Sequence, residues 1–337
     1  MIYDLPLDDL IEYFEKINEK KFRASQVFEW LYKKRISNFD EMTNIKKELL
    51  DKLKSNFTLP RFNVIERLVS SDGTTKYLFE LDDKNTIEAV LMKYQWGNSL
   101  CVTTQVGCNI GCSFCASGLL GKYRDLTVGE IVLQVLQVEE IEDLRVSNIV
   151  IMGIGEPFDN YDNTMKAINI MNHPKGLEIG ARHISVSTSG LVPKIYDFAD
   201  EPFQVNLAIS LHATTDELRD ELMKINKTYN LEELIKACKD YIAKTNRRVT
   251  FEYILLKGVN DSAAHANQLS NLIRGLNAYV NLIPYNEVSE FEFKRTDKKK
   301  ALEFYDIIKK RGINVTLRQE KGIDIFAACG QLRSKSM

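Results

Sequence analysis

The sequence predicts an α/β protein in which a partial, open parallel β/α barrel follows a small N-terminal α+β domain. Strand-like and helix-like segments alternate after about Gly97, which indicates a parallel sheet with right-handed crossovers. Only about six such units fit before residue 311, too few for a closed eight-unit barrel. Residues 1–95 follow a different order, with helices first and short strands afterwards.

The N-terminal part begins with helices. Residues 1–57 have helical patterns, and Val27, Trp30 and Leu31 share one helix face. Turn signals at residues 71–73 and 82–85 then separate three short segments of strand character. The predicted strands are 62–69, 75–81 and 86–94. We therefore expect a small α+β accessory domain at residues 1–95 and a barrel domain at 96–337.

Six strand patterns alternate with helices in the barrel part. The strands are predicted at 99–106, 147–153, 182–188, 204–211, 248–256 and 279–285, and the helices at 127–142, 161–172, 230–244, 262–275 and 297–311. Functional residues of such barrels gather at the carboxyl ends of the strands. Glycine-rich or polar segments stand at four of these ends: 153–157, 185–190, 210–212 and 284–286. Each alone is typical of a turn, but their shared position favours a binding site.

A loop with three cysteines follows the first barrel strand. Cys108, Cys112 and Cys115 have the spacing C-x3-C-x2-C. Thiolates hold iron–sulfur clusters, and a four-iron cubane with three protein ligands keeps one iron open for a small molecule. The spacing resembles that of the radical S-adenosylmethionine (SAM) enzymes, which bind SAM at the open iron. Zinc is disfavoured because no second cysteine pair or nearby histidine accompanies the loop, and a disulfide framework is disfavoured in so long a chain.

Composition and charge narrow the class of protein. No apolar run is long enough to span a bilayer and the N-terminus lacks a signal-peptide pattern, so we expect a cytoplasmic protein with reduced thiols and no membrane partner. The net charge of −2 does not by itself predict nucleic-acid binding. However, residues 294–337 hold twelve basic residues and five acidic ones. This segment fits a phosphate-binding patch and a solvated helix face equally well.

Three further cysteines lie outside the loop. Cys238 lies in an amphipathic helix pattern and fits a small core residue. Cys329 lies among the small residues of 327–330, and basic residues nearby favour a thiolate, so we expect it to be reactive. Cys101, inside the first barrel strand, fits a core residue and a reactive thiol equally well.

Over nearly its whole length the chain resembles the RlmN-type radical SAM adenine C2 methyltransferases, which act on large-subunit ribosomal RNA and on certain tRNAs. The resemblance is carried by residues 101–108 (CVTTQVGC), 155–157 (GEP), 210–212 (SLH), 251–253 (FEY), 258–261 (GVND), 281–286 (NLIPYN) and 327–332 (AACGQL). One departure is Phe326, where members of the family commonly carry an acidic residue. The change affects the loop around the cysteine motif and leaves the motif itself intact.

The resemblance implies roles for individual residues. Cys108, Cys112 and Cys115 would hold a [4Fe-4S] cluster. Cys329 would carry the methyl group, Cys101 would be the second catalytic cysteine, and Glu88 would be the proton acceptor. The residues that would contact SAM are Gly155, Glu156, Ser187, Ser210, Leu211, His212 and Asn286. Two SAM molecules would be used per turnover, one to methylate Cys329 and one to generate the radical.

The resemblance also implies partners. These are 23S ribosomal RNA and tRNA as substrates and an electron donor such as flavodoxin or ferredoxin, and we expect a monomer. The nearest alternative is a Cfr-type adenine C8 methyltransferase, which confers antibiotic resistance, but Pro157 and Pro284 favour the C2 group. A non-catalytic RNA-binding protein with a structural metal is a further alternative from another class.

Overall fold

A single ten-stranded sheet forms the centre of the computed structural model, which describes residues 1–333. The strand order is β1-β2-β3-β4-β7-β8-β9-β10-β11-β12. The strands from β4 to β12 in this order pair in parallel, whereas β1, β2 and β3 continue the same sheet antiparallel. The strand bounds are β1 Asn63–Val69, β2 Thr75–Glu80, β3 Thr86–Tyr94, β4 Gly97–Cys101, β7 Asn148–Ile151, β8 Ile184–Thr188, β9 Asn206–Ser210, β10 Val249–Leu255, β11 Ala278–Pro284 and β12 Asn314–Leu317.

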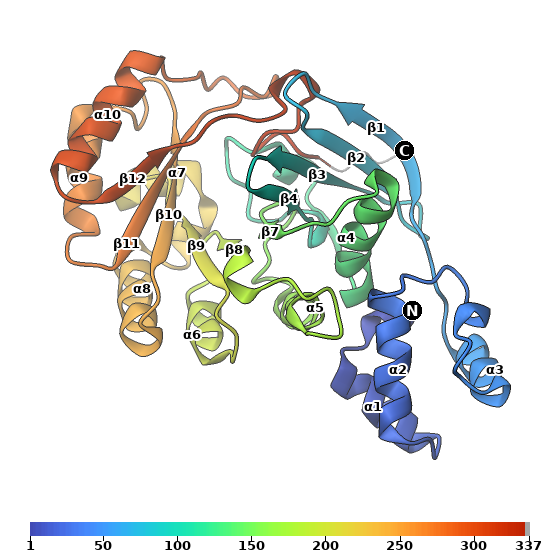
Figure 1. Ribbon diagram of the computed structural model, residues 1–337. Helices are drawn as coiled ribbons and strands as arrows, with labels where there is room; N and C mark the ends of the chain where they lie inside the picture. Colours follow the sequence, from blue (N-terminus) through green and yellow to red (C-terminus); the bar gives the residue numbers. More distant parts are fainter. Residues whose placement is uncertain (334–337) are drawn as a thin grey trace.

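Helices lie on the outer side of the curved sheet (Figure 1). Their bounds are α1 Leu7–Lys16, α2 Lys21–Tyr32, α3 Lys47–Asn56, α4 Val128–Glu142, α5 Tyr161–Asn172, α6 Val192–Asp200, α7 Asp216–Leu222, α8 Leu231–Thr245, α9 Ala263–Leu272 and α10 Lys298–Lys310. Apolar side chains of most of these helices and strands form the main core, and two smaller apolar clusters lie apart from it. Within residues 1–333, no helix has the length and apolar character needed to cross a membrane.

The open parallel β/α barrel predicted from the sequence is confirmed, with one strand broken. The strand expected at 99–106 ends at Cys101, and Gln105–Gly107 (β5) pairs instead with Lys122–Asp125 (β6) in a separate two-stranded sheet. The side chain of Gln134 on α4 explains the break. Its Oε1 accepts from the Thr103 amide at 2.8 Å and its Nε2 donates to the Thr103 carbonyl at 2.9 Å, in place of a neighbouring strand.

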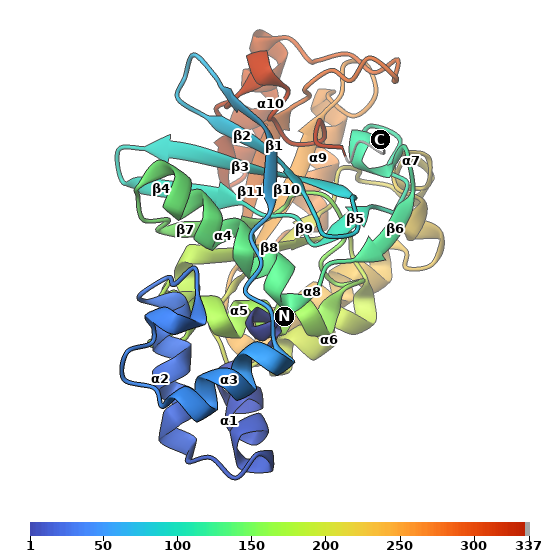
Figure 2. The same ribbon diagram turned by 90° about the vertical axis from the view of Figure 1, so that its right-hand side faces the viewer.

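The N-terminal helices α1, α2 and α3 lie together beside the barrel (Figures 1 and 2). The strands that follow them do not stand apart, because β3 pairs with β4 and the predicted boundary near residue 95 falls in the turn between the two. One sheet therefore contains strands from both predicted domains. The division into 1–95 and 96–337 stays a prediction, and residues 334–337 lie outside the described residues.

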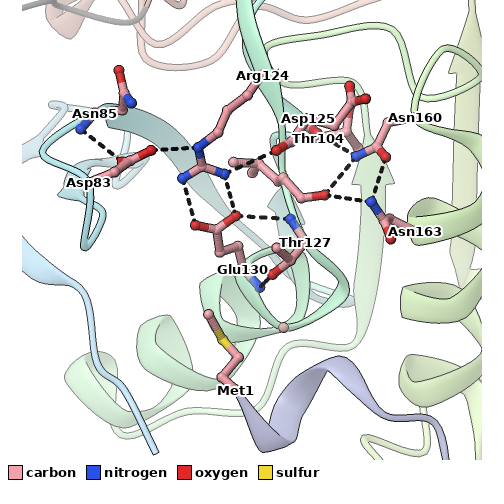
Figure 3. Close-up of polar contacts among 12 residues, drawn as sticks. Met1, Asp83, Asn85, Thr104, Arg124, Asp125, Thr127, Glu130, Asn160 and Asn163 are labelled. Atoms are coloured by element: carbon pink, nitrogen blue, oxygen red, sulfur yellow. Dashed lines mark hydrogen bonds and ion pairs between the residues drawn. The ribbon is translucent and has the colours of Figure 1, made fainter. Parts of the chain in front are cut away.

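A half-buried arginine joins the N-terminal strands to the barrel (Figure 3). Arg124 on β6 donates to Asp83, in the turn between β2 and β3, at 2.6 Å. It also donates to both carboxylate oxygens of Glu130 at 2.7 and 2.8 Å. Glu130 and Thr127 form the capping box at the start of α4. The chain leaving the cysteine loop is thus fixed against both the N-terminal strands and α4.

The segment after β12 connects the two edges of the open sheet. In Figure 1 it runs from β12 across the top of the molecule to the hairpin of β1 and β2. Asp324 accepts from the amide of Ser71 at 3.0 Å, and Asp72 accepts from the amide of Gly322 at 3.1 Å. Lys76 Nζ donates to the Phe326 carbonyl at 3.2 Å. We refer to residues 318–333 as the C-terminal strap, and it carries Cys329.

Candidate active site

The three cysteines of the loop line one cavity of about 160 Å³ at the carboxyl ends of the barrel strands. Cys108 follows β5, and Cys112 and Cys115 precede the short turn at residues 116–118. Burial raises the pKa of all three thiols, that of Cys108 to about 12. A thiol bound to a metal is deprotonated, so a bound cluster would reverse this effect.

Two glycines at the end of β7 also line this cavity. Gly155 has φ +106, and a Cβ there would lie 2.6 Å from the side chain of Gln105. A Cβ on Gly153 would lie 2.6 Å from the Val102 carbonyl. Both glycines are therefore needed for the close packing of this loop against residues 102–105.

Glu156 is buried beside these glycines and fixes the loop. Its Oε2 accepts from the Ser189 amide at 2.7 Å, and its Oε1 accepts from the Phe158 amide at 3.0 Å. Burial raises the pKa of this carboxyl and the two amides oppose that effect. On the neighbouring strands, the hydroxyls of Ser187 and Ser210 lie 3.4 Å apart and both line the cavity.

His212 lies in the same wall, whereas Leu211 does not. The His212 backbone has φ +58, and its Nδ1 accepts from the Ile254 amide at 3.1 Å. Burial lowers the pKa of His212 to about 3, so the ring is neutral. Leu211 is fully buried in the main core and is not among the residues that line the cavity. A contact between Leu211 and SAM would therefore involve its backbone.

Cys329 lies where two cavities meet. It lines the cavity of the cysteine loop, and it also lines a second one of about 30 Å³ together with Cys101 and Asn286. Burial, followed by the nearby Cys329, raises the pKa of the Cys101 thiol to about 12. The two cysteines that the sequence could not place relative to each other thus share one small space.

The loop around Cys329 is held by the cysteine loop itself. The Ala116 amide donates to the Gly330 carbonyl at 2.8 Å, and Ser117 Oγ donates to the Leu332 carbonyl at 2.7 Å. Asn286 Nδ2 donates to the Cys329 carbonyl at 3.5 Å. Among the described basic residues near Cys329 in the sequence (Arg318, Lys321 and Arg333), Arg318 contacts its sulfur, at 3.1 Å.

Glu88 is buried on β3, next to the strap and outside both cavities. Its Oε1 pairs with Lys76 Nζ at 3.0 Å, and its Oε2 accepts from the Arg333 amide at 2.9 Å. The strand pattern alone, Thr86–Val90, predicts an ordinary outward-facing carboxylate at this position. The structure buries it at 4 % exposure because Lys76, on the neighbouring strand, points the same way.

Two charged residues of the site were not identified from the sequence. Arg219 on α7 is fully buried and donates to the carbonyls of Ser189, Ser210 and Leu211 at 2.6, 3.2 and 3.2 Å. Arg219 lies in the segment DELRDEL, whose charged pattern is typical of a surface helix, so the sequence gives no sign that this side chain is buried. Glu252 on β10 lines the first cavity, and the signal for it was a lone carboxylate inside an apolar strand pattern.

The chemistry of the donor set fits a cubane cluster better than a single ion. Within residues 1–333, no three His, Cys, Asp or Glu side chains converge as a single metal ion requires. Each thiolate of a [4Fe-4S] cluster binds a different iron, so the three cysteines need not converge on one point. Two buried polar atoms nearby, Ser189 Oγ and Asn286 Oδ1, have no hydrogen-bond partner among residues 1–333. A polar ligand such as SAM would satisfy them.

Comparison with known proteins agrees with this geometry. Residues 102–268 match the Radical SAM superfamily, and residues 2–59 match the ribosomal RNA large subunit methyltransferase N-terminal domain. A probable dual-specificity RNA methyltransferase RlmN from Listeria monocytogenes is 58% identical, and the alignment covers 100% of this chain and 94% of the relative. A protein of the same name from Geobacillus kaustophilus is 57% identical, with coverage of 99% and 92%.

A solved structure shares the whole fold. The crystal structure of a radical SAM methyltransferase from Sphaerobacter thermophilus superimposes with a TM-score of 0.93 at 45% identity, covering 98% of each chain. The open barrel and the cysteine loop thus define a radical SAM enzyme, a class whose cofactors are SAM and a [4Fe-4S] cluster. At the identities above, the chain belongs to the RlmN family of radical SAM methyltransferases.

Proposed function

We propose that this enzyme methylates C2 of adenine in 23S ribosomal RNA and in certain tRNAs through an S-methylcysteine intermediate. The observation that carries the proposal is the placement of Cys329 between the cavity of the cysteine loop and a second cavity that it shares with Cys101. A methyl carrier needs access to SAM on one side and to a release partner on the other. The names of the relatives support RNA as the substrate.

The target carbon explains why such residues are needed. Adenine C2 is electron-poor, so it does not attack the methyl group of SAM directly. In the proposed reaction Cys108, Cys112 and Cys115 hold the cluster, and Gly155, Glu156, Ser187, Ser210, Leu211, His212 and Asn286 form the surroundings of SAM. When bound, the cluster supplies the electron that cleaves SAM to a 5′-deoxyadenosyl radical.

The remaining steps belong to residues of the chain. Cys329 accepts the methyl group from a first SAM and, after a second SAM has supplied the radical, presents the activated carbon to C2. Glu88 accepts the C2 proton, which requires Arg333 of the strap to move, because its amide occupies the carboxylate. Cys101 then attacks the Cys329 sulfur, so that an S–S bond forms while the bond from this sulfur to the transferred carbon breaks. The carbon takes up a proton to complete the methyl group, the one electron left over from the radical step returns to the electron-transfer partner, and the methylated RNA is released. Close positioning and exclusion of water decide the efficiency of these steps.

The proposal includes two partners, an electron donor and the RNA substrate. The reductive step needs an electron that neither SAM nor RNA supplies, so we include a donor such as flavodoxin or ferredoxin. The enzyme acts as a monomer in the cytoplasm, where its RNA substrates are found. The adenine must leave its stack to reach Cys329, and residues 1–95 together with the basic C-terminal part of the chain grip the folded RNA.

Some basic side chains of the C-terminal segment are held in ion pairs, and others are exposed. Lys300 Nζ pairs with the buried carboxylate of Asp261 at 2.7 Å and Lys294 with Glu287 at 3.1 Å, so these side chains have a structural partner. Lys298 and Lys299, at the start of α10, are exposed and no ion pair holds them among residues 1–333. We therefore assign the phosphate contacts of this segment to Lys298 and Lys299.

Nucleoside analysis tests the proposed function. Total RNA from cells with and without this protein is digested, and 2-methyladenosine is measured by mass spectrometry. We expect the modified nucleoside in both 23S ribosomal RNA and tRNA only when the protein is present. The appearance of 8-methyladenosine would assign the protein to the C8 chemistry instead, and unchanged nucleosides would refute both assignments.

A further inference from the structure

The loop that carries the three cysteines also exposes large apolar side chains. Leu119, Leu120 and Tyr123 follow Cys115 in the turn that leads into β6, and they are 41%, 63% and 73% exposed within residues 1–333. A single exposed leucine is ordinary, but a group of exposed apolar side chains indicates an interaction site. None of these three side chains has a part in the proposed reaction. A partner that covers them would explain their exposure.

The turn is packed tightly against the start of the cysteine loop. A Cβ built on Gly118 would lie 3.5 Å from Gly111 Cα and 3.8 Å from the Cys108 carbonyl oxygen. The amide of Lys122 donates to Asn109 Oδ1 at 2.8 Å. The turn therefore rests on the segment between the first two cysteines, and it holds the exposed apolar side chains beside the residues that would bind the cluster.

Two lysines border the same surface. The amide of Ser113 donates to the Leu222 carbonyl at 3.0 Å, which fixes the end of α7 against the cysteine loop. Lys224 follows directly, and a Cβ built on Gly111 would lie 3.5 Å from its Cδ and 3.7 Å from its Nζ. Lys224 and Lys227 are exposed, and no ion pair holds either of them within residues 1–333. The side chain of Lys224 thus lies over the cysteine loop with its charge free.

Other charges near this surface are paired or of opposite sign. Lys122 Nζ pairs with Asp125 at 3.0 Å and with Asp159 at 2.8 Å. Glu221, on α7, is exposed three residues before Lys224 and offsets part of its field. Among the described residues, Lys224 is therefore the unpaired cation in contact with the cysteine loop.

The composition of this surface distinguishes between kinds of partner. RNA is bound through its phosphates by cations and through its bases by aromatic or polar side chains, and neither contact uses leucine. Leu119 and Leu120 instead fit the apolar centre of a protein interface, with Lys224 on its charged rim. In Figure 2 the loop from β5 to β6 lies at the outer edge of the molecule, away from the N-terminal helices. A protein bound here would therefore lie beside the cysteine loop and present acidic residues to Lys224.

We propose that the surface formed by Leu119, Leu120, Tyr123 and Lys224 is the docking site of the electron donor, a small redox protein whose redox group lies among acidic residues. The inference rests on the proposed function, because that reaction needs an electron which neither SAM nor RNA supplies. In the step that docking serves, the donor loses one electron and the cluster gains it, and no bond forms or breaks. Attraction to Lys224 raises the rate of encounter, and apolar contact at the leucines lengthens the life of the complex.

Binding of a purified flavodoxin tests the proposal. The cluster-loaded full chain is immobilised without oxygen, and association and dissociation of reduced flavodoxin are followed by biolayer interferometry. Leu120→Asp should raise the Kd at least about tenfold, because it places a like charge where the acidic donor makes apolar contact. Lys224→Glu should lower the association rate constant by about tenfold at low salt, and the difference should disappear at about 1 M salt.

Reduction of the cluster, followed by stopped-flow absorbance, gives an independent readout. Both variants should be reduced more slowly by flavodoxin than the wild type. Dithionite is a small reductant that needs no docking site, so with dithionite both variants should be reduced and should cleave SAM at the wild-type rate. If Leu120→Asp does not hold a cluster, Tyr123→Ser takes its place at the most exposed of the three apolar positions.

Controls separate docking from a general effect of added charge. Leu302 on α10 is 42% exposed, so Leu302→Asp makes the same change on another surface and should bind flavodoxin like the wild type. Glu221→Gln removes the acid near Lys224 and should not weaken binding. The affinity for RNA should be the same in Leu120→Asp and in the wild type.

Three results would overturn the proposal: a wild-type enzyme that binds neither flavodoxin nor ferredoxin, unchanged donor binding in Leu120→Asp and Lys224→Glu, or a loss in Leu120→Asp that Leu302→Asp reproduces. Loss of RNA binding with intact donor binding would assign the surface to RNA instead. The proposed function fails by a different result. Normal donor docking and SAM cleavage without 2-methyladenosine would leave the docking site standing and reject the methyl transfer.

Discussion

Glu142 joins three strands to one helix through a single carboxylate, and its removal gives a quantitative test of how the N-terminal strands are held. Its Oε1 accepts from Tyr77 on β2 at 2.5 Å and from Arg67 Nη2 on β1 at 2.6 Å. Its Oε2 pairs with Lys93 on β3 at 3.1 Å. Because Glu142 is the last residue of α4, the substitution Glu142→Gln weakens the junction between β1–β3 and the barrel.

The lowered pKa of Glu142 sets the size of the expected loss in the free energy of unfolding. Burial alone would raise this pKa, but the bonds from Tyr77, Arg67 and Lys93 outweigh burial and hold it at about 2, against 4.5 for an ordinary glutamate. At about 1.4 kcal/mol per pKa unit, the upper limit is roughly 3 kcal/mol. Arg67 and Lys93 are 43% and 46% exposed, so solvent screens part of this energy. We expect Glu142→Gln to lower the free energy of unfolding by about 1 to 2 kcal/mol at pH 7.

The sign of the pH dependence is fixed by the lowered pKa. The contribution of Glu142 is complete above its unfolded pKa near 4.5 and is lost as the pH falls toward 2. Urea denaturation of wild type and Glu142→Gln at pH 7, 5 and 3.5 should therefore show a difference that shrinks below pH 4.5. Glu140→Gln is the matched control, since Glu140 is 52% exposed and forms a single ion pair within residues 1–333, with Arg61 at 3.1 Å. A Glu142→Gln loss no larger than the control, or one independent of pH, would refute the reasoning.

Three further predictions concern the site and the RNA. Gly155→Ala should abolish SAM binding, measured by equilibrium dialysis, because the new Cβ would lie 2.6 Å from a neighbouring side chain at a backbone φ of +106; retained affinity would contradict this. Replacement of Lys298 and Lys299 by alanine should weaken RNA binding and reduce the slope of log K against log salt by about 1 to 2, as each lost phosphate contact removes about 0.7 to 0.9; an unchanged slope would count against this surface. Cys101→Ala should still accept a methyl group on the carrier cysteine but should retain RNA covalently, visible on a denaturing gel, whereas normal product release would exclude its proposed role.

The sequence predicted the barrel because its strand and helix periods are long and regular. The alternation after Gly97 gave six parallel strands, and the structure contains each of them. The break at Thr103 was not predictable, since it depends on the side chain of Gln134, a residue of the next helix. The strand β12 was missed because it is short and half exposed, so its pattern resembles a loop.

The sequence predicted those parts of the site that lie in short local motifs. The cysteine spacing and the polar segments at the strand ends led directly to the residues around the first cavity. The pairing of Cys101 with Cys329 could not be read from 228 residues of separation, because it depends on where the strap crosses the barrel. Arg219 was missed for a related reason, since a charged residue in a charged helix gives no sign of burial.

Anchoring of the strap to the hairpin of β1 and β2 has a consequence for biogenesis. Residues 318–333 attach to Ser71, Asp72 and Lys76, which precede their partners in the strap by 250 to 253 residues, so translation makes the docking site well before the strap. The loop that holds Cys329 can therefore dock only where the hairpin of β1 and β2 has formed. A fragment that begins at residue 96 would build the cysteine loop but would have nowhere to dock the tail that completes it.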